Sequence, residues 1–271
     1  MKTTQCGGGK IYSFALSEIE YIGYFYGTNG NEDIRDAYTR ISKERGKQPD
    51  FFMNAELFEF SSRKAASDVV ANGKIHRLTE GYGIAFPENK TAVFSYKNNV
   101  NAKDYIGAYP LLAKNGAEHI QNPAGITGTR GRTALGLDGK NLYVALIPDK
   151  NGVTLSTLRR AFLTAGAKDA INLDGGGSTQ FYAPKGNYFT GRKVRGFIGV
   201  WRKSNSEDSL KLTPDVRVVK VRTNLRIRTS ASLLGKVVGR LYDGDMVTVL
   251  EEKKGWCRIS SGWVSSAYLV K

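Results

Sequence analysis

The segment Asp174-Gly175-Gly176-Gly177-Ser178-Thr179 offers the clearest chemistry in the sequence. Three consecutive glycines remove every Cβ from one side of a turn, so the backbone can approach a ligand closely and point N–H groups at an anion. Asp174 supplies a carboxylate at the rim of this loop, and Ser178 adds a hydroxyl group. A plain turn with a capping Asp or Ser is the competing interpretation. The glycines fit neither the G-x-G-x-x-G template nor the P-loop, so nucleotide-binding motifs do not apply.

The elements before this loop explain where it would lie. Residues 142–147 are nearly all apolar and indicate a buried strand. Apolar residues at helical spacing over 155–165 predict a helix, and residues 170–173 predict a second strand. We expect the two strands to run parallel, joined by a right-handed crossover. Asp174 then stands beyond the carboxyl end of a strand, where ligands gather in α/β sheets.

The chain divides into two parts. A polar stretch begins at residue 202, and after Pro214 short alternating segments follow one another, separated by Gly and Asp. Several such strands in a short span predict a small closed barrel. We therefore expect an α+β catalytic domain with a mixed sheet and helices over 1–201, including a helix over 34–45. A linker over 202–214 and a small all-β barrel over 215–271 complete the prediction.

Composition and charge narrow the class of partner. The chain is 41% hydrophobic with a net charge of +15, as in a globular protein that meets a polyanion. Both parts are basic, and no zinc-finger, helix-turn-helix or RNA-binding pattern is visible, so we expect no nucleic-acid partner. Cys6 and Cys257 form neither a metal-binding spacing nor a disulfide framework.

The N-terminal residues lack the apolar segment of a secretory signal, and no apolar run is long enough to span a membrane. These features predict synthesis in the cytoplasm without a signal peptide, no stable membrane insertion and a monomer.

Several sequence blocks resemble the phosphodiester glycosidase family, whose reaction breaks the C1–O bond between a sugar and a phosphate diester. The resemblance covers roughly residues 50–201, and its most specific block is Ala170-Ile171-Asn172-Leu173-Asp174-Gly175-Gly176-Gly177-Ser178. The other matching blocks are Arg132-Thr133-Ala134-Leu135-Gly136-Leu137, Gly152-Val153-Thr154-Leu155, Phe51-Phe52-Met53-Asn54 and Arg192-Lys193-Val194. Glu56 and Leu57 depart from the small and aromatic residues usual after the asparagine.

The resemblance implies roles for the matched residues. Asp174 becomes the nucleophile or general base, with Asn54 and Glu56 as further catalytic candidates. Arginine suits a phosphate because its planar fork meets two oxygens at once. The substrate- and phosphate-binding candidates are Arg132, Thr133, Gly175, Gly176, Gly177, Ser178 and Arg192.

A second carboxylate is expected by the usual logic of glycosidases. Glu56, Asp68, Asp138 and Asp149 are all available, and Glu56 is attractive because it would share a strand face with Asn54. A solvated charge at a strand end is the alternative for Glu56.

His76 and His119 lie in polar stretches, and we interpret both as surface residues. The sequence contains no metal-ligand cluster and predicts no cofactor, although a divalent cation held by carboxylates stays open.

The C-terminal part resembles the bacterial SH3 family over about residues 216–271, through Leu225-Arg226-Ile227-Arg228, Gly255-Trp256-Cys257-Arg258-Ile259 and Gly262-Trp263-Val264. Such domains usually bind cell-wall peptides or glycopolymers. The resemblance implies Trp256, Trp263 and Tyr268 as wall-binding residues, and Cys257 as a packing residue.

Together these resemblances imply a cell-wall-directed glycoside hydrolase of the endolysin or autolysin type, from a bacteriophage or a bacterium. It would cleave a sugar-phosphodiester or related glycosidic bond at the bacterial cell wall, with a wall glycopolymer or peptidoglycan as its partner. Two alternatives stay open at this point. One is a peptidoglycan glycosidase that cuts the ordinary glycan backbone, and the other is a binding protein that recognises a phosphorylated glycan without turnover.

Overall fold

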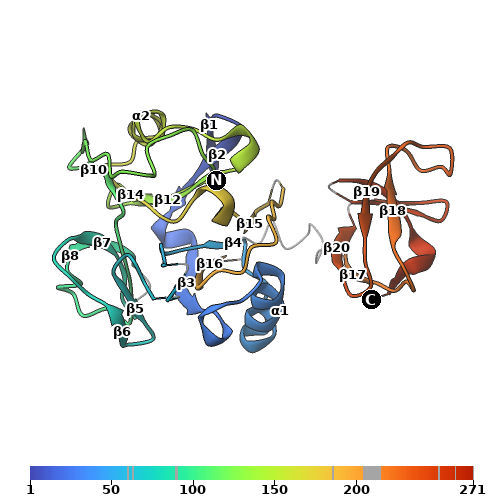
Figure 1. The fold of residues 1–271 in the computed structure, drawn as a ribbon, viewed down its shortest axis with the longest axis horizontal. Coiled ribbons are helices and arrows are strands. Elements are labelled where there is room, and N and C mark those ends of the chain that lie inside the picture. Colours follow the sequence, from blue (N-terminus) through green and yellow to red (C-terminus); the bar gives the residue numbers. More distant parts are fainter. Residues whose placement is uncertain are drawn as a thin grey trace. The chain divides into compact units, whose positions relative to one another are not determined.

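A computed structural model describes residues 1–203 and 215–270, apart from 60, 63, 89, 90, 185, 250 and 260. The chain forms two compact units, Met1–Lys203 and Ser204–Lys271 (Figure 1). The linker expected over 202–214 lies almost wholly outside the described residues, and its first residue, Arg202, ends a strand instead.

The expected α+β class is wrong, because the first unit consists mainly of strands. The described residues contain two α-helices, α1 (Ile34–Arg45) and α2 (Leu155–Ala165), and both match the predicted spans. The sequence missed the strands over 2–6, 9–15 and 19–26, and many of the other missed strands lie between residues 69 and 118, where they are two to five residues long. Strands this short leave little alternation to detect. Tight turns separate them, for example at Asn72 (φ 47°) and Asn115 (φ 54°), since Asn tolerates the left-handed conformation.

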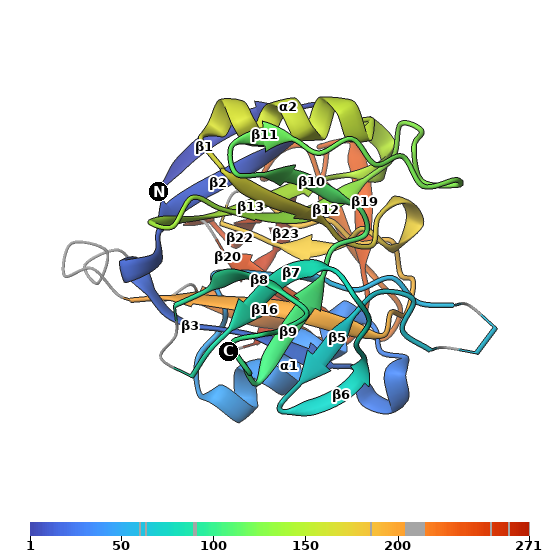
Figure 2. The same cartoon turned by 90° about the vertical axis from the view of Figure 1, so that its left-hand side faces the viewer.

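A seven-stranded antiparallel sheet contains the strands on either side of α2. Its order is β1 (Lys2–Cys6), β2 (Gly9–Ala15), β13 (Asn141–Ile147), β12 (Arg132–Leu137), β14 (Asp169–Asn172), β10 (Leu111–Lys114) and β11 (Ala117–Glu118). Strands β13 and β14 run in the same direction, as predicted, because both pair antiparallel with β12, which lies between them. Helix α2 lies along one face of this sheet, where Leu158 and Phe162 are fully buried (Figure 2).

The second sheet has four strands and packs against α1. Its order is β15 (Phe181–Tyr182), β4 (Phe51–Asn54), β16 (Gly196–Arg202) and β3 (Ile19–Tyr26). Asp33 caps the N-terminus of α1 by accepting a hydrogen bond from Arg35 N at 2.9 Å. The buried face of the helix, with Ile34 and Ile41, then packs on Phe52 and other residues of the sheet.

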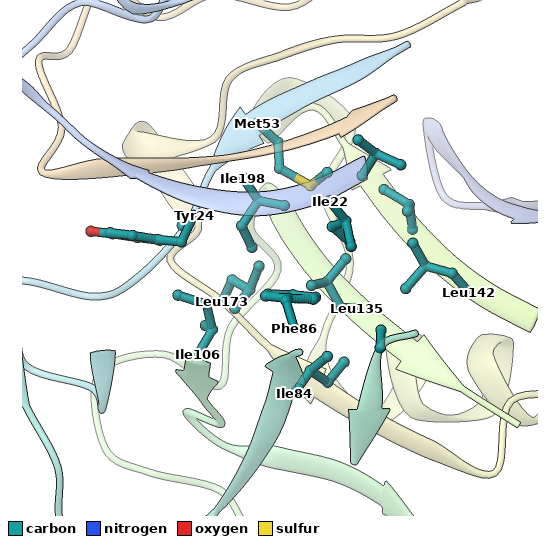
Figure 3. Close-up of a cluster of buried hydrophobic side chains, with 14 of the residues drawn as sticks. Ile22, Tyr24, Met53, Ile84, Phe86, Ile106, Leu135, Leu142, Leu173 and Ile198 are labelled. Carbon is teal, nitrogen blue, oxygen red and sulfur yellow. The ribbon is translucent and has the colours of Figure 1, made fainter. Parts of the chain in front are cut away.

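A third sheet of five strands completes the first unit. Its order is β6 (Lys74–Arg77), β5 (Val69–Ala71), β9 (Asp104–Gly107), β7 (Tyr82–Phe86) and β8 (Val93–Tyr96). The main core joins all three sheets, because Leu135, Ile198 and Ile84 come from different sheets and belong to one buried cluster (Figure 3). This common core fixes the sheets relative to one another.

The second unit has its own core and two small antiparallel sheets. The first sheet has the order β20 (Met246–Val249), β17 (Asp215–Val219) and β24 (Leu269–Val270). The second has the order β19 (Val237–Leu241), β18 (Leu225–Arg228), β23 (Gly262–Ser265), β22 (Trp256–Ile259) and β21 (Glu251–Lys253). Cys257 is fully buried in this core, so its predicted packing role is confirmed.

Candidate active site

The glycine loop connects two sheets of the first unit. It leaves β14 at the seven-stranded sheet and enters β15 at the four-stranded sheet. Asn54, the last residue of β4, ties the two ends of the loop together. Its Nδ2 donates to Asp174 O at 2.8 Å, and its Oδ1 accepts from Gln180 N at 3.1 Å. The hydroxyl of Thr133 donates to the same Asp174 oxygen at 2.6 Å. Asn54 and Thr133 therefore position Asp174 through its backbone.

Close contacts, rather than flexibility, explain the glycines. A Cβ on Gly175 would lie 2.5 Å from Gly131 O, and one on Gly177 would lie 2.7 Å from Arg192 Nη2. Gly176 has φ +58°, a conformation that favours glycine. A side chain at Gly175 would push the backbone of Gly131 away, one at Gly177 would displace the guanidinium of Arg192, and one at Gly176 would be strained by the positive φ.

The loop does not form the anion nest that its glycines suggested. Gly175 N donates to Asp174 Oδ1 and Gly176 N donates to Gly131 O, both at 2.9 Å. The N–H groups of Ser178 and Thr179 also donate to carbonyl oxygens within the loop. Because these donors already have protein acceptors, side chains are better placed than the backbone to hold an anion here.

Asp174 lies half-buried at the centre of this arrangement. Burial raises the pKa of its carboxyl group to about 6, against the lowering effects of the Ser178 hydroxyl, the Gly175 N–H and the Arg192 guanidinium. Arg192 is exposed, and its Nη1 donates to Ser178 Oγ at 3.2 Å. Arg192, Ser178 and Asp174 therefore form a connected polar group that reaches the surface.

Glu56 lies near Asp174 but is fully enclosed. Its Oε1 is 3.0 Å from Arg195 Nε. Burial raises the pKa of Glu56 to about 7, Tyr24 and Arg195 lower it, and the charge of Asp174 raises it. The alternative interpretation of Glu56 as a solvated strand-end charge is wrong. A carboxylate without an exposed surface cannot touch a substrate in this arrangement, so Glu56 can act only through its neighbours.

Arg132 is 1% exposed, and its guanidinium is bonded to the chain. Its Nη2 donates to the carbonyl oxygens of Ile126 at 2.8 Å and Gly128 at 2.7 Å, and its Nε donates to Val153 O at 3.1 Å. Burial and the neighbouring Arg130 lower the pKa of Arg132 to about 10. The structure therefore places Arg132 as an anchor of the segment before β12.

Arg130 is a site residue that the sequence did not single out. It is exposed, and its Nη1 would lie 3.8 Å from a Cβ on Gly176. The sequence shows two arginines, Arg130 and Arg132, separated by one residue, but it does not reveal which of them faces solvent. In the structure Arg130 and Arg192 are the exposed cations against the glycine loop.

His76 is not an isolated surface residue. It is half-buried, its ring stacks on Tyr26 with centroids 4.6 Å apart, and its Nδ1 lies 3.3 Å from Arg195 Nη2. No group of three His, Cys, Asp or Glu side chains suited to a metal ion occurs among the described residues. No helix in the described part of the chain is long and apolar enough to cross a membrane.

In the second unit the three predicted wall-binding aromatics differ in exposure. Tyr268 is 49% exposed, whereas Trp256 and Trp263 are half-buried. Tyr268 lines a groove of about 570 Å³ together with Lys220, Arg222 and others, and neither tryptophan is among the described residues that line it. The structure therefore separates Tyr268 from the two tryptophans.

A half-buried carboxylate with a pKa near neutrality, beside exposed guanidinium groups, is suited to acid–base or nucleophilic chemistry on an anionic ligand. Comparison with known proteins agrees with this class of site. The family model "Phosphodiester glycosidase" matches residues 49–201, more than half of the chain, and "Bacterial SH3 domain" matches residues 223–270. The chain belongs to the phosphodiester glycosidase family and carries a C-terminal bacterial SH3 domain.

Solved structures support the fold. The catalytic domain of zebrafish N-acetylglucosamine-1-phosphodiester alpha-N-acetylglucosaminidase, auto-inhibited by its pro-peptide, matches with a TM-score of 0.55 and 16% identity. That match covers 72% of this chain and 77% of the zebrafish chain. A hypothetical protein from Synechocystis matches with a TM-score of 0.56 and 12% identity over 74% of this chain and 61% of its own. A search of curated proteins found no match.

Proposed function

We propose that the first unit hydrolyses the bond between a sugar C1 and a phosphodiester oxygen, with Asp174 as its catalytic carboxylate. The observation that carries this proposal is the half-buried Asp174 carboxyl, with its pKa raised to about 6, next to the exposed Arg192. Membership of the phosphodiester glycosidase family supports the same reaction.

The arginines are suited to bind the phosphate, which is the leaving group of the reaction. A phosphate monoester dianion leaves without strong protonation, so the demanding tasks are holding the phosphate and stabilising the positive charge that develops on the sugar. Arg130 and Arg192 supply charge for the first task, and the Asp174 carboxylate supplies it for the second. Asp174 acts either as the nucleophile or as the base that activates water. Water completes the hydrolysis, giving a free sugar and a phosphate monoester.

Release of N-acetylglucosamine from a synthetic N-acetylglucosamine-1-phosphodiester tests the reaction. We expect Asp174→Asn to lower kcat by about a thousandfold, as removal of a catalytic acid–base group does. Asp36→Asn, at an exposed position on α1, is the matched control and should keep full activity. Full turnover by Asp174→Asn would overturn the assignment of Asp174.

We propose further that the second unit directs this hydrolysis to the bacterial cell wall, in an enzyme of the endolysin or autolysin type. A bacterial SH3 domain next to a glycosidase-family domain supports this role. Mass spectrometry of the products from purified walls distinguishes the candidate bonds. Freed sugar supports phosphodiester cleavage, cut glycan chains support a peptidoglycan glycosidase, and no product supports a protein that only binds.

A chain that ends at Lys203 tests the targeting role. The first unit has its own core, so this shortened chain should fold and hydrolyse the small substrate at the full rate. We expect it to lose sedimentation with purified walls. Wall binding equal to that of the whole chain would contradict targeting by the second unit.

A further inference from the structure

A chain of polar contacts leads from the enclosed Glu56 to His76. Arg195 occupies the middle, with its Nε 3.0 Å from Glu56 Oε1 and its Nη2 3.3 Å from His76 Nδ1. The guanidinium carbon of Arg195 also lies 4.9 Å from the centroid of the Tyr26 ring, on which His76 stacks. The guanidinium of Arg195 therefore contacts Glu56, His76 and Tyr26 at once.

This geometry specifies the charge state of His76. A guanidinium group has N–H donors and no acceptor, so Nδ1 of the imidazole must be the acceptor. An imidazole nitrogen accepts only when it carries no proton, which requires neutral His76 with its proton on Nε2. Protonation of Nδ1 would remove the acceptor and place a second cation against Arg195.

The same contacts reach the backbone of the catalytic residue. Arg195 precedes Gly196, whose carbonyl oxygen accepts from Ala55 N at 3.1 Å. The carbonyl oxygen of Ala55 in turn accepts from Asp174 N at 2.8 Å, and Glu56 is the next residue along the chain. The Arg195–Glu56 pair therefore joins the side chains of two backbone segments that are also hydrogen-bonded to each other. One of these segments, at Ala55, accepts the hydrogen bond from Asp174 N.

His76 is the end of this connection that solvent can reach. It lines a cleft of about 800 Å³, whereas Glu56 has no exposed side-chain surface. The other charged groups along the cleft are Arg40, Glu44, Lys74, Glu88, Lys103 and Asp104. Burial, Arg195 and Lys74 lower the pKa of His76, which favours the neutral imidazole.

We propose that His76 is a positioning residue for Asp174: neutral His76 holds Arg195 on Glu56, and protonated His76 releases it. This inference rests on the proposed function, in which Asp174 is the catalytic carboxylate. It gives His76, which lines the cleft, a role in the pH dependence of catalysis by Asp174.

The inference is tested in the full chain by measuring how steeply log kcat falls as the pH is lowered. In the parent protein both Asp174 and His76 must lose a proton for full activity, so the slope of log kcat against pH exceeds one over the range in which both groups titrate. His76→Asn places an amide oxygen near the position of Nδ1 and does not titrate. This variant should keep kcat at pH 7 within about twofold and should reduce the slope to one.

His76→Phe keeps an aromatic ring on Tyr26 but has no acceptor. We expect its kcat at pH 7 to fall about tenfold with little change in KM, the size expected for a lost hydrogen bond to a charged group. His119→Phe is the matched control, because the backbone of His119 makes its hydrogen bonds: its N–H donates to Leu112 O and its carbonyl oxygen accepts from Gln121 N. This control should retain both the kcat and the slope of the parent.

The outcomes separate the two proposals. A slope in His76→Asn as steep as that of the parent, or an unchanged kcat in His76→Phe, overturns the role of His76 while Asp174→Asn remains inactive. Turnover by Asp174→Asn overturns the proposed function itself, whatever the histidine variants do.

Discussion

Two pairs of arginines surround the site, and they differ in what their guanidinium groups contact. Arg130 and Arg192 are exposed against the glycine loop, whereas Arg132 and Arg195 are 1% and 6% exposed. The enclosed pair holds the protein together, Arg132 through carbonyl oxygens and Arg195 through Glu56. An arginine engaged in this way cannot meet a phosphate without giving up those bonds. We therefore expect the exposed pair to bind the ligand and the enclosed pair to stabilise the protein.

The largest effect is expected where an enclosed charge loses its partner. Glu56→Gln leaves the guanidinium of Arg195 buried beside a neutral group, which we expect to cost about 3 kcal/mol in the free energy of unfolding. The comparison is made at pH 8, because the pKa of Glu56 is raised to about 7 and the parent carboxylate is mostly ionised above that pH. Glu251→Gln is the matched control, because Arg258 Nε lies 3.0 Å from Glu251 Oε2, the same distance as in the enclosed pair. Both partners of the control pair are more than 40% exposed, so its loss should cost below about 0.5 kcal/mol.

Calorimetry of each variant measures the unfolding of the unit that carries the substitution. A loss from Glu56→Gln no greater than that from Glu251→Gln would show that enclosure does not distinguish the two pairs.

The sequence predicted which residues of this region lie together better than it predicted the fold class. The matching blocks identified Asp174, Asn54 and Thr133, and the structure brings all three together within one group of hydrogen bonds. Helix periodicity also predicted the spans of α1 and α2. These successes depend on local patterns that a single segment carries.

The failures concern contacts between distant segments. The pairing of Glu56 with Arg195 and the position of His76 depend on how the sheets pack, and no spacing along the chain reveals them. The exposure of an arginine is equally invisible, so Arg132 could not be distinguished from Arg192 by residue type. The fold class failed because many of the unpredicted strands have only two to five residues, which carry too little alternation to be recognised. The longer strands over 9–15 and 19–26 lack a strict alternation of buried and exposed residues.

Paired substitutions test the division of the arginines directly. Arg132→Met leaves three carbonyl oxygens without their donor, so we expect a loss of about 2 kcal/mol in the free energy of unfolding. Arg192→Met should leave stability unchanged and raise KM for the phosphodiester about tenfold, because one charged contact to phosphate is lost. If Arg132→Met raised KM and left the free energy of unfolding unchanged, Arg132 would be a ligand-binding residue and the division would be wrong.

The pH dependence provides a smaller test of the same division. Asp174 must be ionised to act, and burial raises its pKa to about 6 while Arg192 lowers it. Activity should therefore be full above about pH 7 and fall as the pH drops through 6, because the carboxylate takes up a proton. Arg192→Met removes a cation that favours the ionised form, so its acid limb should move to higher pH. An acid limb that stays in place in Arg192→Met would contradict the coupling of Arg192 to Asp174.

The smallest effect is expected in the second unit, where the same contrast of exposure separates the aromatic residues. Tyr268 is 49% exposed in the groove beside Lys220 and Arg222, whereas Trp263 is half-buried. Tyr268→Ala should weaken binding to purified walls about threefold without lowering the melting temperature of this unit, because one exposed aromatic contact is lost. Trp263→Ala should lower the melting temperature, since a half-buried ring supports the fold. Equal wall binding by Tyr268→Ala and the parent chain would move the contact surface away from this groove, and the half-buried tryptophans would then be the residues to test.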